Sequence, residues 1–185
     1  MTRRGARRQV LAALVCILAV CRTAAGGSAE ESGEVLRVAV PIAAWALTFH
    51  HDDAQGRRDF YESFAANVLA TYALKQVVDK ERIDGSDDDA FPSGHASTTF
   101  QSAAFLHRRY GISRAWWAYA LAAYTGWTRI DADKHDAADV LGGAAVGIAS
   151  SFLLTQPREQ SFVWVPEFGP DYVGIRFSLA LESRR

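Results

Sequence analysis

Apolar positions recur along most of the chain in stretches of helical length, and Gly, Pro or Asp residues separate these stretches. The pattern predicts helices near residues 34–50, 57–80, 93–109, 112–130 and 136–154. A polar turn follows the first helix, and an acidic stretch at 84–89 follows the second. No internal repeat is evident. Residues 30–157 are therefore expected to form one domain, an all-α bundle of about five core helices.

Residues 158–185 have a different pattern. Phe162–Val165 and Tyr172–Leu181 favour strands, and the segment between them contains Pro166, Gly169 and Pro170. Apolar and polar residues alternate with a period of two at 174–179. The expectation is a short β-like tail that can form a hairpin. Its expected role is packing or strand pairing rather than chemistry.

The beginning of the chain reads as a targeting segment, residues 1–29. Four arginines precede an apolar stretch at 10–21, and small residues follow at 23–25. The apolar stretch is short for a membrane span, which favours a cleaved signal peptide over an uncleaved anchor. In either case the domain is exported to the cell envelope. Both cysteines, Cys16 and Cys21, lie in this segment, so a cleaved chain would have no disulfide or cysteine nucleophile.

Composition argues against nucleic acid as a partner and does not decide whether helices cross a membrane. The 185 residues carry 20 basic and 21 acidic side chains with no basic stripe, so nucleic acid is not expected as a partner. The apolar run at 140–154 falls short of a full span, and other helices contain charges such as Arg37, Glu62 and Lys75. Several membrane spans and a soluble or surface-docked bundle both remain possible. Neither reading changes the expectation of a single catalytic domain.

Three clusters of residues supply what cleavage of a phosphate ester needs. The first is Lys75 with Arg82, a fixed cation and a guanidinium fork that suit phosphoryl oxygens. The second is Ser93-Gly94-His95, which follows Pro92 at a predicted helix start, where free N–H groups favour an anion. The Ser93 hydroxyl can donate, and a protonated His95 could supply a leaving alkoxide with its proton.

The third cluster is Arg129, His135 and Asp139. The spacing of four between His135 and Asp139 places them on one helix face, where the carboxylate can accept the Nδ1–H of the imidazole. Nε2 is then free to act as a nucleophile. Arg129 can reach the same anion. Each cluster alone has an ordinary structural explanation, but the three together are far more specific.

These clusters resemble the three-part signature of the type-2 phosphatidic acid phosphatases, shared with bacterial non-specific acid phosphatases and vanadium haloperoxidases. The resemblance covers about residues 70–150 and keeps the spacing inside each cluster. Two positions depart from it: Ile83 replaces the usual proline, and Thr128 replaces the usual serine. Neither change removes a charge or a proton carrier, but the first could loosen the loop that presents Arg82.

The resemblance implies a helical bundle with its pocket at one end, and it implies roles. His135 would attack phosphorus and form a phosphohistidine, Asp139 would orient it, and His95 would protonate the leaving group. The equatorial oxygens would be held by Lys75, Arg82, Arg129, Ser93 and the Gly94 N–H. No metal or other cofactor is called for, because the cations are built into the chain.

The expected function is hydrolysis of phosphate monoesters, with a lipid phosphate or lipid pyrophosphate at the outer face of the inner membrane as the leading substrate. A soluble periplasmic acid phosphatase acting on small esters is the alternative. A vanadate-dependent haloperoxidase and a non-catalytic anion binder are less favoured. The sequence leaves the exact substrate, the oligomeric state and the number of membrane spans open.

Overall fold

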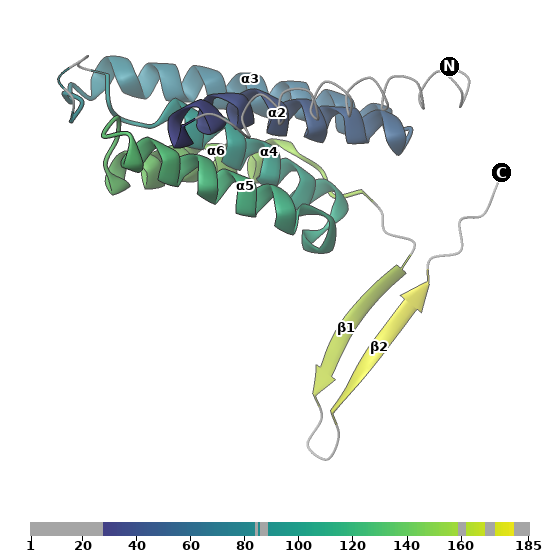
Figure 1. Cartoon of the computed structure of the whole chain (residues 1–185). Coiled ribbons are helices and arrows are strands. Elements are labelled where there is room, and N and C mark those ends of the chain that lie inside the picture. Colours follow the sequence, from purple (N-terminus) through teal and green to yellow (C-terminus); the bar gives the residue numbers. More distant parts are fainter. Residues whose placement is uncertain (1–27, 84, 86–88, 159–161, 169–172, 180–185) are drawn as a thin grey trace.

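The computed structural model describes residues 28–83, 85, 89–158, 162–168 and 173–179, so the expected targeting segment lies almost entirely outside the described residues. In the described part the helices run nearly parallel or antiparallel to one another (Figure 1). They are α2 (Ala29–His50), α3 (Ala54–Val77), α4 (Gly94–Tyr110), α5 (Ile112–Asp131) and α6 (Ala137–Leu154). The predicted all-α bundle is confirmed.

The central helix of the bundle is α4, which contacts all four of the others. Its closest neighbour is α6, where two glycines lie directly against the α4 backbone. A Cβ atom on Gly143 would lie 2.3 Å from the Ser93 carbonyl oxygen, and one on Gly147 would lie 2.3 Å from that of Ser97. The absence of side chains at these two positions therefore brings the first turns of α4 and α6 together.

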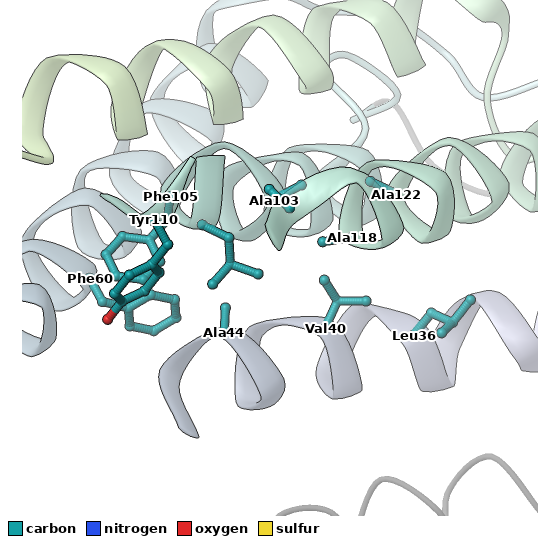
Figure 2. Close-up of a cluster of buried hydrophobic side chains, with 11 residues drawn as sticks. Leu36, Val40, Ala44, Phe60, Ala103, Phe105, Tyr110, Ala118 and Ala122 are labelled. Atoms are coloured by element: carbon teal, nitrogen blue, oxygen red, sulfur yellow. The ribbon is translucent and has the colours of Figure 1, made fainter. Parts of the chain in front are cut away.

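The apolar core lies between α2, α4 and α5. Figure 2 shows Leu36, Val40 and Ala44 on one face of α2, facing Ala118 and Ala122 of α5. Near the turn between α2 and α3 the core becomes aromatic, since Phe60, Phe105 and Tyr110 cluster there. The aromatic group lies at the end of the bundle where α2 turns into α3, beside the buried side chains of Asp53 and Arg109.

Three helix boundaries differ from the sequence prediction by three residues or more, and one of them is the start of α3, at Ala54 rather than 57. Helix α2 begins at Ala29 rather than 34, because Ser28 and Glu31 form a reciprocal capping box. The sequence Ser28-Ala29-Glu30-Glu31 carries that signature, which the apolar pattern alone does not show. Helix α3 ends at Val77 rather than 80, and the chain then runs extended through Lys80, which forms an isolated β-bridge with Asp89.

The tail forms an antiparallel hairpin of β1 (Phe162–Phe168) and β2 (Val173–Leu179). Pro166 was expected to end the first strand, but it lies within β1 opposite Ile175. Figure 1 shows the hairpin standing apart from the helices, and neither strand contacts a described helix.

Candidate active site

Four parts of the chain meet at the end of the bundle away from the α2–α3 turn and surround a cleft of about 390 Å³. They are the end of α3, the segment leading into α4, the end of α5 and the turn before α6. The predicted residues that line the cleft are Lys75, Arg82, Gly94, His95, Arg129 and His135. The other two, Ser93 and Asp139, are buried beside it, and the Ser93 N–H donates to the Asp139 carbonyl at 2.9 Å. All eight predicted residues therefore come together.

His135 and Asp139 lie close together, but the local structure that brings them together differs from the one predicted. His135 precedes α6 and lies in a turn, where its N–H donates to the Arg129 carbonyl at 3.2 Å. The two residues do not share a helix face, which corrects the reasoning from their spacing. Even so, His135 Nδ1 lies 3.6 Å from Asp139 Oδ2, just beyond hydrogen-bond length, and both side chains are buried. The carboxylate is in place to orient the imidazole.

The Asp139 carboxylate is held by two further groups that the sequence did not indicate. Lys80 Nζ lies 2.6 Å from Oδ1 and also 2.7 Å from the carboxylate of Asp136. The Asp136 N–H donates to Oδ2 at 3.1 Å, and the Asp139 N–H donates back to Asp136, forming a capping box at the start of α6. Oδ1 is therefore occupied by a cation, and Oδ2 is the oxygen that faces His135.

Burial sets the charge state of His135. Burial lowers its pKa to about 4; Asp139 opposes this shift, while Lys75, Arg82 and Arg129 add to it. The imidazole is therefore neutral at pH 7. A neutral imidazole whose Nδ1 faces a carboxylate leaves the Nε2 lone pair available for attack.

The first cationic cluster is organised by Asp89. Arg82 donates to Asp89 Oδ1 from Nε at 3.2 Å and from Nη2 at 2.6 Å. Lys75 Nζ donates to the Asp89 carbonyl and lies 3.6 Å from its carboxylate. Burial lowers the pKa of Lys75. Asp89 thus holds both cations at the rim of the cleft.

Glu34 of α2 lies beside two of the predicted residues, His95 and Arg129. Its Oε1 lies 2.8 Å from His95 Nε2 and 3.2 Å from Arg129 Nη1. Despite this short distance, His95 Nε2 makes no contact of full hydrogen-bond geometry within the described residues. Burial lowers the pKa of His95, and the Glu34 carboxylate opposes that shift. A carboxylate oxygen therefore occupies a position that a phosphoryl oxygen could take.

The start of α4 has donors without acceptors. The Ser93 side chain is buried, makes no capping hydrogen bond, and its hydroxyl has no partner within the described part of the chain. A Cβ atom on Gly94 would meet nothing within 4 Å, so the backbone there is open to the cleft. The unsatisfied N–H groups and the helix dipole favour an anion at this point.

The two positions that depart from the expected signature have different consequences. The Thr128 hydroxyl donates to the Thr125 carbonyl at 2.8 Å and is buried, so it does not face the cleft. Thr128 packs instead against Gly33 of α2. Ile83 is exposed and lies outside the cleft lining. Within the described residues, no group of three His, Cys, Asp or Glu side chains is placed to hold a metal ion.

A comparison with family models gives one match that spans more than half of the chain, the model described as PAP2 superfamily, over residues 40–162. The chain belongs to the PAP2 superfamily. The resemblance to type-2 phosphatidic acid phosphatases is therefore confirmed. The matched segment contains every one of the eight predicted site residues, from Lys75 to Asp139.

Several curated proteins are similar to this chain. A lipid A 1-phosphatase of Porphyromonas gingivalis is 44% identical over 70 residues, covering 36% of this chain and 16% of the relative. A lipid A 1-phosphatase of Helicobacter pylori is 30% identical over 134 residues, covering 68% of this chain and 66% of the relative. A lipid A 4′-phosphatase of Helicobacter pylori is 27% identical over 157 residues, covering 78% of this chain and 79% of the relative. The chain thus spans less than two thirds of the length of the first two relatives. No solved structure matches the chain.

Proposed function

We propose that this protein is a metal-independent phosphatase that hydrolyses phosphate monoesters of lipids through a phosphohistidine on His135. The observation that carries the proposal is the cleft itself. A buried, neutral imidazole backed by a carboxylate faces a space lined by four cationic side chains, those of Arg37, Lys75, Arg82 and Arg129, and by an open helix start. Such an arrangement fits a tetrahedral anion that accepts a nucleophile.

The residues present account for both halves of the reaction. His135 Nε2 attacks phosphorus in line, the bond to the ester oxygen breaks, and His95 gives its proton to that oxygen. Asp139 stabilises the positive charge that develops on the imidazole of His135. In the second half, neutral His95 takes a proton from a water molecule that attacks phosphorus, the P–N bond breaks, and phosphate leaves. Lys75, Arg82 and Arg129 hold the remaining oxygens throughout.

His95 must be protonated before it can act as an acid, although burial lowers its pKa in the anion-free site. A bound phosphate monoester displaces the single negative charge of Glu34 from Arg129 and brings up to two negative charges close to His95. Because a nearby negative charge favours the protonated imidazole, substrate binding raises the pKa of His95. The substrate thereby supplies the condition for its own cleavage.

Two observations support a lipid as the substrate. The relatives are named lipid A 1-phosphatase and lipid A 4′-phosphatase. In addition, Ala29–His50 and Ala137–Leu154 are long and apolar enough to cross a membrane, a property that buried helices of soluble proteins can share. We infer a membrane-associated enzyme of the cell envelope whose site faces the periplasm.

The test is phosphate release from a lipid phosphate and from a soluble ester, with EDTA present, for the wild type and His135→Ala. The proposal predicts release from the lipid phosphate that EDTA leaves unchanged and that the substitution abolishes. Preference for the soluble ester would indicate an acid phosphatase instead. Phosphate binding without turnover would indicate an anion-binding protein, and bromide oxidation with vanadate a haloperoxidase. Activity that survives His135→Ala would contradict the mechanism.

A further inference from the structure

A second cavity of about 360 Å³ lies between α2 and α3. Its lining consists of Pro41, Ile42 and Trp45 from α2 and Phe60, Tyr61 and Phe64 from α3. The only side-chain donor groups among these six, on Trp45 and Tyr61, are joined by a hydrogen bond of 2.8 Å. The cavity therefore offers aromatic and aliphatic surface and no free polar side-chain group. We call it the α2–α3 groove.

The groove lies next to the phosphate cleft. Arg37 lines the cleft, and Pro41 of the groove follows it by four residues on α2. On α3, Val68 lines the cleft and Phe64 of the groove precedes it by four residues. Since four residues advance a helix by about 6 Å, the two cavities are about one helical turn apart along both helices. The groove continues about one further turn, to Trp45.

The groove lies on the outer side of the bundle core, since Phe60 at its base belongs to the core cluster while Trp45 and Phe64 are only partly buried against that cluster. The core face of α2 is formed by Leu36, Val40 and Ala44, which Figure 2 shows facing α4 and α5. Groove residues such as Ile42 and Tyr61 are at least one third exposed. The space is of the size that small ligands occupy, and it is too small for a helix of a partner protein.

We propose that the α2–α3 groove binds an acyl chain of the lipid whose phosphate lies in the cleft. The proposal rests on the proposed function, because it takes the cleft to be the site of the phosphate. The ligand class follows from the sequence of surfaces along α2 and α3: cations at the cleft, then apolar side chains for about two turns. A phosphate head with a hydrocarbon chain attached a few bonds away matches that order.

A chain-length series provides the activity test. The full chain in nanodiscs of one lipid composition would be assayed with alkyl phosphates from butyl to decyl. Each methylene removed from water should raise kcat/KM by up to about fourfold, equivalent to about 0.8 kcal/mol, until the groove is filled. Ile42→Trp should flatten this dependence by filling the groove. Val38→Trp is the matched control, because Val38 is exposed on α2 and lines neither cavity.

The outcomes separate the groove from general partition into the nanodisc. Val38→Trp should hydrolyse butyl phosphate at the wild-type rate and keep the wild-type dependence on chain length. If Ile42→Trp shows the same dependence as Val38→Trp, the groove does not bind the chain. If the wild type hydrolyses no member of the series, the proposed function fails. The binding test below then decides whether the groove binds the chain.

The binding test uses Trp45 as a reporter within the groove. A decyl phosphate with bromine atoms near the middle of its chain should quench the part of the fluorescence that Trp45→Phe removes. Excess inorganic phosphate should relieve this quenching by competing for the cleft. Quenching of Trp45 that phosphate does not relieve, or no quenching of Trp45, would overturn the proposal whether or not the protein hydrolyses esters.

Discussion

Gly143→Ala tests whether the contact between α4 and α6 positions the catalytic groups. The added methyl group would lie 2.3 Å from the Ser93 carbonyl oxygen and 3.0 Å from the Ser97 nitrogen, both backbone atoms. Ordinary van der Waals contact begins at about 3.4 Å, so the two helices must separate by about 1.1 Å. The hydrogen bond between the Ser93 N–H and the Asp139 carbonyl lies at this contact. The displacement therefore moves the open start of α4 away from Asp139.

The expected loss of activity follows from that displacement. A misplacement of about 1 Å in a catalytic site lowers the rate by about 100-fold. Overpacking of this kind also destabilises a protein by about 1–3 kcal/mol. The higher helix propensity of alanine returns up to about 1 kcal/mol of that. We expect kcat/KM to fall about 100-fold and Tm to fall by a few degrees.

Gly147→Ala is the matched control. Its methyl group would also lie 2.3 Å from a backbone carbonyl oxygen of α4, that of Ser97, so it should destabilise the protein to a similar extent. It lies about 6 Å farther along α6 from the catalytic end. Steady-state kinetics and thermal unfolding would be measured for both variants under one set of conditions. If Gly143→Ala keeps the wild-type kcat/KM, or if both variants lose activity equally at equal Tm, the contact does not position the site.

Three further predictions concern single charged residues. Lys80→Met should lower kcat at least about tenfold. It should also move the acidic limb of the pH profile to higher pH, because a less neutralised Asp139 carboxylate raises the pKa of His135. Lys80→Arg should retain most of the activity, and equal losses in the two variants would contradict this role. Glu34→Gln should tighten inorganic phosphate binding roughly two- to fivefold in calorimetry, because the amide competes less for Arg129, and an unchanged Kd would show that Glu34 does not compete. Burial acts to raise the pKa of Asp53, but Arg109 and other donors lower it to about 2 from 3.8. The stability that this carboxylate contributes should therefore be full above about pH 5 and fall by about 2 kcal/mol in total as the pH falls to about 1. Asp53→Asn should remove that pH dependence in denaturant titrations, and a variant that keeps it would place its origin elsewhere.

The fold could be predicted from the sequence because apolar stretches of helical length, bounded by Gly, Pro or Asp, recur along the chain, and because the family resemblance implied a helical bundle. The ends of the helices were harder to predict, because capping residues and not apolar residues determine where a helix begins or ends. Ser28 with Glu31 sets the start of α2, and this pair lies outside the apolar stretch. Pro166 was read as a strand breaker, yet it is accommodated in β1 of a two-stranded hairpin. A strand at the edge of a sheet need not use every N–H for pairing.

The site residues could be predicted because their chemistry is distinctive, but their geometry could not. The spacing of His135 and Asp139 suggested a shared helix face, whereas a turn before α6 brings the two together. Glu34 escaped notice because it lies far from the three clusters in sequence and reaches them only through the packing of α2. Lys80 lies between two predicted residues, but nothing in the sequence distinguishes it from a solvent-exposed lysine.

The most direct test of the central claim is to trap the phosphorylated enzyme. His95→Gln would be mixed with p-nitrophenyl phosphate, whose leaving group departs without an acid, and quenched in alkali, in which phosphohistidine survives. Without His95 to activate water, the second step should be slow, so the account predicts a phosphoryl group on His135 that mass spectrometry can locate and that acid removes. Release of nitrophenol with no phosphorylated protein, or a phosphoryl group on any other residue, would contradict it.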